Sequence, residues 1–133
     1  MVNACNPHYI DRASSESCAW TEGFADAVAA KVLGDRQYVY PDANKAPAPF
    51  EPSGCTAGQQ CAWPGGRATQ GNVGAAMLDL WAADGGWNSG FAAMATEVSP
   101  GVKAYFAHRY PSPGSTVTGI YDRHGLQENT GVL

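Results

Sequence analysis

The sequence predicts a mainly α-helical fold, an irregular bundle of four or five short helices with one long disulfide-stapled loop. Apolar residues recur at helical spacing in several separate stretches. The 16 glycines and 9 prolines interrupt these stretches and predict loops between them. A hydrophobic content of 44% with 15% charged residues argues against disorder, and 133 residues suit one core. We therefore expect a single domain over residues 1–133.

The first helix is predicted to follow an N-terminal loop. Residues 1–15 hold turn formers without a hydrophobic period. The segment 16–34 is expected to hold a helix over about residues 16–33. Ser15 or Ser17 can cap its start, and Gly34 suits its end. Five apolar side chains recur at helical spacing and are expected to face the core: Trp20, Phe24, Ala27, Val28 and Val32.

Residues 35–70 are predicted to form a long surface loop. This segment contains five prolines and several glycines, and only Gln37 to Tyr40 has the composition of a strand. Loops of this length are uncommon unless they are functional or cross-linked. We therefore expect a disulfide to hold it.

Four cysteines, Cys5, Cys18, Cys55 and Cys61, are the candidates for that cross-link. The absence of any Cys-x-x-Cys pair argues against a zinc ribbon or a thioredoxin-like motif. Three connectivities are possible, and we favour 5–18 with 55–61 because a short polar turn with a glycine separates Cys55 from Cys61. Disulfides imply a secreted, extracellular protein; the alternative is four buried thiols in a cytosolic one.

Residues 71–125 are predicted to form a helical subdomain, followed by a tail over 126–133. A helical stripe runs from Gly71 to Asp84 and ends at two glycines. Three further helices are expected to begin at Asn88 or Ser89, at Pro100, and at Ser115 or Thr116, and the last is expected to stop at Gly125. The side chains expected to face inward on these three helices are Phe91, Met94, Val98, Val102, Tyr105, Phe106, Val117, Ile120 and Tyr121.

Charge and hydropathy exclude two classes of partner. The net charge is −4 and the eight Lys and Arg residues are scattered, so we expect no nucleic-acid binding. No apolar run reaches the roughly 20 residues of a membrane span, so we expect no membrane partner. Residues 1–15 lack the pattern of a signal peptide, so an export signal has been removed or was never part of this chain.

The first helix carries a pair of carboxylates, Glu22 and Asp26, beside its apolar stripe. Four residues apart, they share one helix face and repel each other by a few tenths of a kcal/mol, on the order found for like-charged pairs. The pair is either a solvated surface feature or a set of ligands.

The string from Cys18 to Asp26, Cys-Ala-Trp-Thr-Glu-Gly-Phe-Ala-Asp, resembles the third-ligand helix of gluzincin zinc metallopeptidases. This resemblance covers residues 5–34, extends more weakly over 71–84, and suggests the C-terminal subdomain of a secreted bacterial hydrolase of this type. It implies that Glu22 is a zinc ligand and that Asp26, one turn later, orients a ligating histidine. A small residue such as Gly23 beside the ligand would let a neighbouring helix approach closely.

The other half of such a zinc site is missing from the sequence. A gluzincin takes two ligands and its general base from His-Glu-x-x-His, and no such motif occurs here. A lone Glu22 cannot hold zinc tightly. We expect either the C-terminal part of a longer domain, whose N-terminal segment brings the histidines, or a scaffold that has lost the chemistry, so whether this chain is an enzyme stays open.

The histidines offer two candidate roles. His8 in the N-terminal loop is a candidate metal ligand, or it simply hydrogen-bonds that loop. His124 is a candidate catalytic group that stabilises an oxyanion, or a cation favoured by the C-terminal end of a helix. His108 shows no feature that suggests a function, apart from the same favourable interaction with the C-terminal end of a helix.

Two function hypotheses follow. The first is a zinc metallopeptidase-like domain, an incomplete or inactive half, with an N-terminal peptidase segment or a peptide or protein substrate as partner and zinc only when the missing ligands are supplied. The alternative is a secreted protein- or glycan-binding or assembly module that uses loop aromatics: Tyr38, Tyr40, Trp63 and Trp87. A glycosidase is disfavoured, because two carboxylates on one helix do not readily flank a glycosidic bond.

Overall fold

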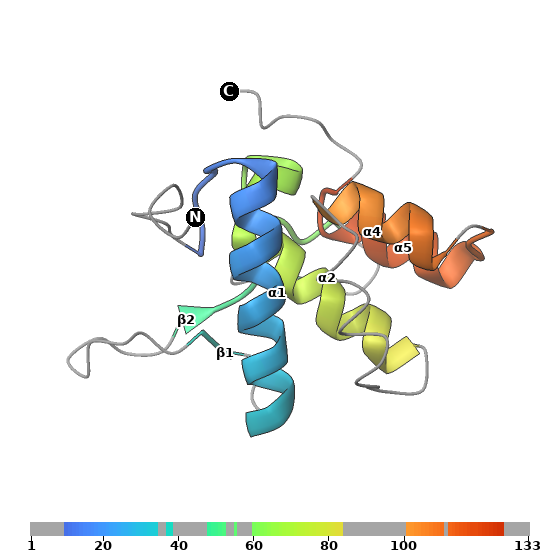
Figure 1. Ribbon diagram of the computed structural model, residues 1–133. Coiled ribbons are helices and arrows are strands. Elements are labelled where there is room, and N and C mark those ends of the chain that lie inside the picture. The colour runs from blue at the N-terminus through green and yellow to red at the C-terminus, as the bar shows by residue number, and fades with distance from the viewer. Residues whose placement is uncertain are drawn as a thin grey trace.

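The computed structural model describes residues 10–34, 37–38, 48–52, 55, 60–83, 101–110 and 112–126. Within these ranges the chain forms four α-helices, one 3-10 helix and a two-stranded sheet, so the prediction of a mainly helical fold is confirmed. The strands β1 (Gln37–Tyr38) and β2 (Ala48–Pro49) pair antiparallel, and the 3-10 helix η2 covers Gly66–Ala68. Figure 1 shows α1 and α2 crossing at the centre, with α4 and α5 side by side at one end.

Helix α1 (Glu16–Leu33) begins and ends as the sequence predicts. The Ser15 hydroxyl accepts a hydrogen bond from the Cys18 N–H at 3.1 Å. Gly34 closes the helix in the left-handed conformation, with φ of 73°, which favours glycine. The predicted apolar stripe is correct except at Val32, which is 75% exposed, because the buried face of α1 ends at Ala30.

Helix α2 (Gln70–Ala83) is the central element of the core. Most of its residues are buried, including Val73, Met77, Leu80 and Trp81. On α1, Phe24 packs edge-to-face against the Trp81 ring, with ring centroids 5.8 Å apart. The predicted burial of Phe24 in the core is therefore confirmed, and α2 supplies its aromatic neighbour.

Helices α4 (Val102–Arg109) and α5 (Ser115–Arg123) close the other side of the core. The Trp20 ring stacks on Tyr105 of α4 with ring centroids 5.0 Å apart. Two predicted starts are wrong by one or two residues: α4 begins after Gly101, so Pro100 is not its first residue, and Gly114, not Ser115 or Thr116, is the N-cap of α5. At both starts the N-cap is a glycine in extended conformation, which has no side chain to cap the helix, so the serine, threonine and proline signals do not mark the boundary.

The end of α5 leads back into the core. Gly125, with φ of 73°, ends the helix as predicted, and Leu126, the first residue of the predicted tail, is fully buried. Arg67 of η2, which is 6% exposed, donates from Nε to Glu16 Oε1 at 3.2 Å and from a terminal guanidinium nitrogen to the Leu126 carbonyl at 2.9 Å. This arginine therefore links the start of α1 to the end of α5.

The predicted Cys55–Cys61 disulfide is confirmed, with Cα atoms 5.5 Å apart. Cys18 is also disulfide-bonded, but its predicted partner Cys5 lies outside the described residues. The helix predicted around Phe91, Met94 and Val98 lies outside them too. None of the described helices is long and apolar enough to cross a membrane.

Candidate functional site

The two carboxylates of α1 lie on one helix face, and both side chains are partly buried. Gln70, the first residue of α2, is 2% exposed and donates from Nε2 to Asp26 Oδ2 at 2.5 Å. The amide thus holds the Asp26 carboxylate in a fixed position. Whether Glu22 and Asp26 act as zinc ligand and orienting residue stays a prediction.

The close approach of α1 and α2 brings Gln70 to Asp26. Gly23 lies against the first turn of α2, where a Cβ atom would stand 2.8 Å from the Gln70 carbonyl oxygen and 2.9 Å from Val73 Cβ. Gly74 of α2 in turn lies near the Gly23 carbonyl, which a Cβ on Gly74 would approach to 3.3 Å. The expectation that Gly23 permits close helix packing beside Glu22 is therefore confirmed.

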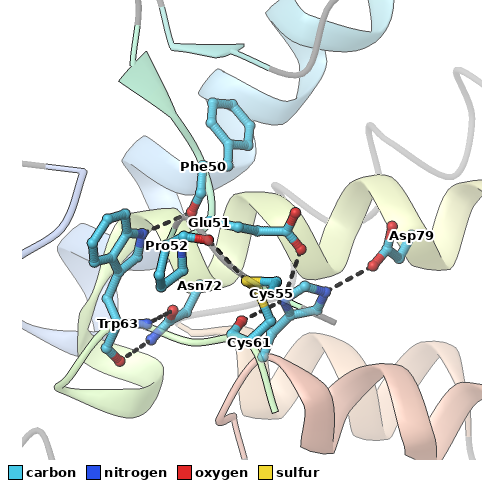
Figure 2. Close-up of a disulfide and its surroundings, with 9 residues drawn as sticks. Phe50, Glu51, Pro52, Cys55, Cys61, Trp63, Asn72 and Asp79 are labelled. Atoms are coloured by element: carbon cyan, nitrogen blue, oxygen red, sulfur yellow. Dashed lines mark hydrogen bonds and ion pairs between the residues drawn. A yellow bond between two sulfur atoms is a disulfide. The ribbon is translucent and has the colours of Figure 1, made fainter. Parts of the chain in front are cut away.

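A second group of ionisable side chains surrounds His124, which is fully buried. Its Nε2 lies 2.7 Å from Asp79 Oδ2, and its Nδ1 lies 3.2 Å from the Cys61 carbonyl oxygen and 3.6 Å from Glu51 Oε2. Figure 2 shows Asp79 on α2 and Glu51 on the segment after β2, with the dashed lines of these interactions between them.

Each member of this group is fixed by a different part of the fold. His124 caps the C-terminus of α5, and the neighbouring Arg123 carbonyl accepts from the Cys61 N–H at 2.6 Å. Asp79 projects from α2. Glu51 follows Phe50, whose carbonyl accepts a hydrogen bond from Trp63 Nε1 at 2.8 Å (Figure 2). The loop that carries the Cys55–Cys61 disulfide therefore places both Glu51 and the Cys61 carbonyl next to His124.

The other predicted site residues fall in different places. His124 has no exposed surface and both its ring nitrogens face oxygen atoms, while His8 lies outside the described residues. Trp63 is partly buried and hydrogen-bonded to Phe50, whereas Tyr40 and Trp87 lie outside the described residues.

Sequence reasoning missed Gln70, Glu51 and Asp79. Asp79 carries a signal, because it is the one charged residue in the apolar stretch from Ala75 to Ala83. Gln70 and Glu51 carry none, because only the tertiary packing gives them their partners.

The comparisons with known proteins give one finding. The family model described as the Mycolysin C-terminal domain matches residues 1–130. The chain belongs to this family. No curated protein matches the chain, and no solved structure does.

Membership of the Mycolysin C-terminal domain family confirms the coarser part of the resemblance. The chain is a C-terminal domain of a mycolysin-type peptidase, which associates it with a metallopeptidase. The family match assigns no role to Glu22, Asp26 or His124.

Proposed function

We propose that this domain completes the active site of a secreted zinc metallopeptidase by supplying Glu22 as a zinc ligand. The observation that carries the proposal is the pairing of Glu22 with Asp26 on one face of α1, in a chain that belongs to the Mycolysin C-terminal domain family. A preceding segment of the peptidase would bring the two histidines and the general base.

The residues present fit this half of a zinc centre. Glu22 is partly buried and offers the carboxylate oxygen that zinc accepts beside two histidines. Asp26 lies one turn further on with its Oδ2 fixed by Gln70, so its carboxylate is set to accept an N–H from an incoming imidazole and hold that ring in place. Zinc, when bound, supplies Lewis-acid chemistry that polarises a peptide carbonyl.

The domain alone does not form this centre. Catalytic zinc sites use three protein ligands, and α1 brings only Glu22. The chain alone should therefore bind no zinc at Glu22 and hydrolyse no peptide. His124 is left out of the proposed chemistry because its ring is fully buried against oxygen atoms. The Cys55–Cys61 disulfide supports the secreted location.

The test joins this chain to a segment carrying His-Glu-x-x-His in one polypeptide and measures zinc affinity by calorimetry and peptide hydrolysis by fluorescence. Glu51→Gln and Asp79→Asn are present throughout, so that the group around His124 does not contribute. Glu22→Gln should abolish tight binding and hydrolysis. Asp26→Asn should weaken affinity by about 10–100-fold, as the loss of a hydrogen bond to a ligating histidine does.

Asp122→Asn, which removes one exposed carboxylate from α5, is the matched control and should leave both readouts unchanged. Zinc affinity that is insensitive to Glu22→Gln would contradict the ligand assignment. Tight, Glu22-dependent binding without hydrolysis would instead identify a scaffold that has kept the metal and lost the chemistry.

A further inference from the structure

One ligand atom from each of Glu51, Asp79 and His124 lies within 4.8 Å of the other two. We propose that these three residues bind one divalent transition-metal cation, at a site that includes neither Glu22 nor Asp26. This inference does not depend on the proposed function, because the group is complete within this chain.

The hydrogen bonding of His124 prepares one ring nitrogen for a metal. Nδ1 lies 3.2 Å from the Cys61 carbonyl oxygen and Nε2 lies 2.7 Å from Asp79 Oδ2, and both of these oxygens accept hydrogen bonds. A metal bound between the ring and Asp79 would take the place of a proton on Nε2, while Nδ1 keeps its N–H and its contact with the Cys61 carbonyl. A ligating histidine that donates its other N–H to a backbone carbonyl is the usual arrangement around protein-bound metals.

The charges of the group favour a cation. Two carboxylates converge on one buried imidazole, and their ligand atoms lie within 4.8 Å of each other. Like charges this close repel, and opposite charge between them removes that repulsion. A divalent cation with two carboxylates and a neutral imidazole gives a net charge of zero at the site.

The exposure of the three side chains also suits a metal site. The His124 side chain is 0% exposed, while those of Glu51 and Asp79 are 27% and 28% exposed. The buried imidazole would therefore hold the cation from the core side, and the two partly exposed carboxylates would hold it from the surface side. Water on that open side can complete a coordination shell of four.

The ligand types narrow the choice of metal. Imidazole nitrogen suits zinc, iron, nickel and copper, whereas magnesium and calcium prefer oxygen ligands throughout. One imidazole and two carboxylates therefore favour a first-row divalent cation, and we use Zn²⁺ as the probe. Ligand atoms around zinc stand roughly 3 Å apart, so the Asp79 carboxylate must move outward from its 2.7 Å contact with Nε2. Glu51, whose Oε2 now lies 3.6 Å from Nδ1, must turn towards Nε2, and the partial exposure of both carboxylates allows these movements.

The test is calorimetric titration of the 133-residue chain with Zn²⁺, together with its melting temperature in zinc and in chelator. We expect one equivalent of zinc and a higher melting temperature with zinc than with chelator. Glu51→Gln and Asp79→Asn each remove one ligand charge while keeping the side-chain shape, and each should weaken binding at least 10-fold. Addition of Ca²⁺ should not displace the zinc.

Asp122→Asn removes an exposed carboxylate elsewhere and should bind zinc like the unmodified chain, and Glu22→Gln shows whether any of the zinc is held at Glu22. Circular dichroism on all four variants checks that they are folded. The proposal is overturned if the folded chain binds no zinc, or if its zinc affinity is unaffected by Glu51→Gln and Asp79→Asn. Zinc binding lost only in Glu22→Gln would also overturn it, and would contradict the expectation that the chain alone binds no zinc at Glu22.

Discussion

Gly23 of α1 and Val73 of α2 meet with no room for a side chain on the glycine. A Cβ atom at position 23 would lie 2.9 Å from both Cβ and Cγ1 of Val73, closer than such atoms pack. The contact sits one residue from Glu22 and sets the distance between α1 and the start of α2. The position of the Asp26 carboxylate relative to Gln70 therefore depends on it.

Gly23→Ala should destabilise the domain by about 1–3 kcal/mol, because the added methyl group meets the backbone and a β-branched side chain that cannot move aside. Denaturant unfolding measures this. The control is Gly119→Ala on α5, where nothing lies within 4 Å of the new Cβ, and this change should stabilise by roughly 0.5–1 kcal/mol. Equal effects of the two variants would show that the close approach is not a real constraint.

Local signals in the sequence identify α1, because a serine cap, a helical stripe and a terminal glycine agree there. The same signals mislead at the starts of α4 and α5, where glycines in extended conformation serve as caps. The inward orientation of Val32 is also predicted wrongly, because helical periodicity does not say where the neighbouring helix ends.

The two candidate sites also differ in how much of each can be predicted from local sequence. Glu22 and Asp26 are neighbours on one helix, so the sequence alone places them on one face. The group of Glu51, Asp79 and His124 spans 74 residues of sequence, from 51 to 124, and forms only when the loop that carries the Cys55–Cys61 disulfide packs on α2 and α5. Apart from the single charge of Asp79 within an apolar stretch, a group of this kind leaves no local pattern in the sequence.

Trp20 and Phe24 anchor the first helix in the aromatic core. Their side chains are 4% and 7% exposed, and they contact Tyr105 and Trp81 respectively. Truncating either to Ala should cost about 3–5 kcal/mol, enough to unfold a marginally stable domain. Thermal melting is the measurement, with Val32→Ala at an exposed position of the same helix as control. Melting temperatures of Trp20→Ala and Phe24→Ala close to that of the control would show that α1 is turned differently.

Tyr121 gives the domain a pH dependence at high pH. Burial raises the pKa of the Tyr121 hydroxyl to about 12, and the nearby Arg67 guanidinium partly offsets this. The folded state holds the phenol proton more tightly than the unfolded state, so this stability is fully present below pH 10 and is lost as the pH rises towards 12. Between pH 9 and 11 the loss should be about 1 kcal/mol.

Tyr121→Phe removes the ionisable hydroxyl and should remove that part of the pH dependence, although the variant differs in stability at neutral pH. Denaturant unfolding of both proteins at pH 8, 9, 10 and 11 gives the two slopes. The prediction fails if the slopes are the same. An absorbance titration of both folded proteins at 295 nm supplies an independent check, because Tyr121→Phe should remove one tyrosine that ionises late.

The Cys55–Cys61 disulfide should stabilise both the fold and the group around His124. Alkylation of the intact protein without reductant should label none of the four cysteines, as measured by mass spectrometry.

Cys55→Ala breaks the bond and keeps the buried Cys61 side chain, and the lost constraint on this short loop should cost about 2 kcal/mol. Because the Cys61 carbonyl accepts from His124 Nδ1, a loosened loop should also weaken zinc binding by the chain. Adding Cys61→Ala separates the two causes: a further large loss of stability would assign the effect to packing at Cys61, whereas an unchanged value supports the cross-link. If Cys55→Ala binds zinc as tightly as the unmodified chain, the loop does not position His124.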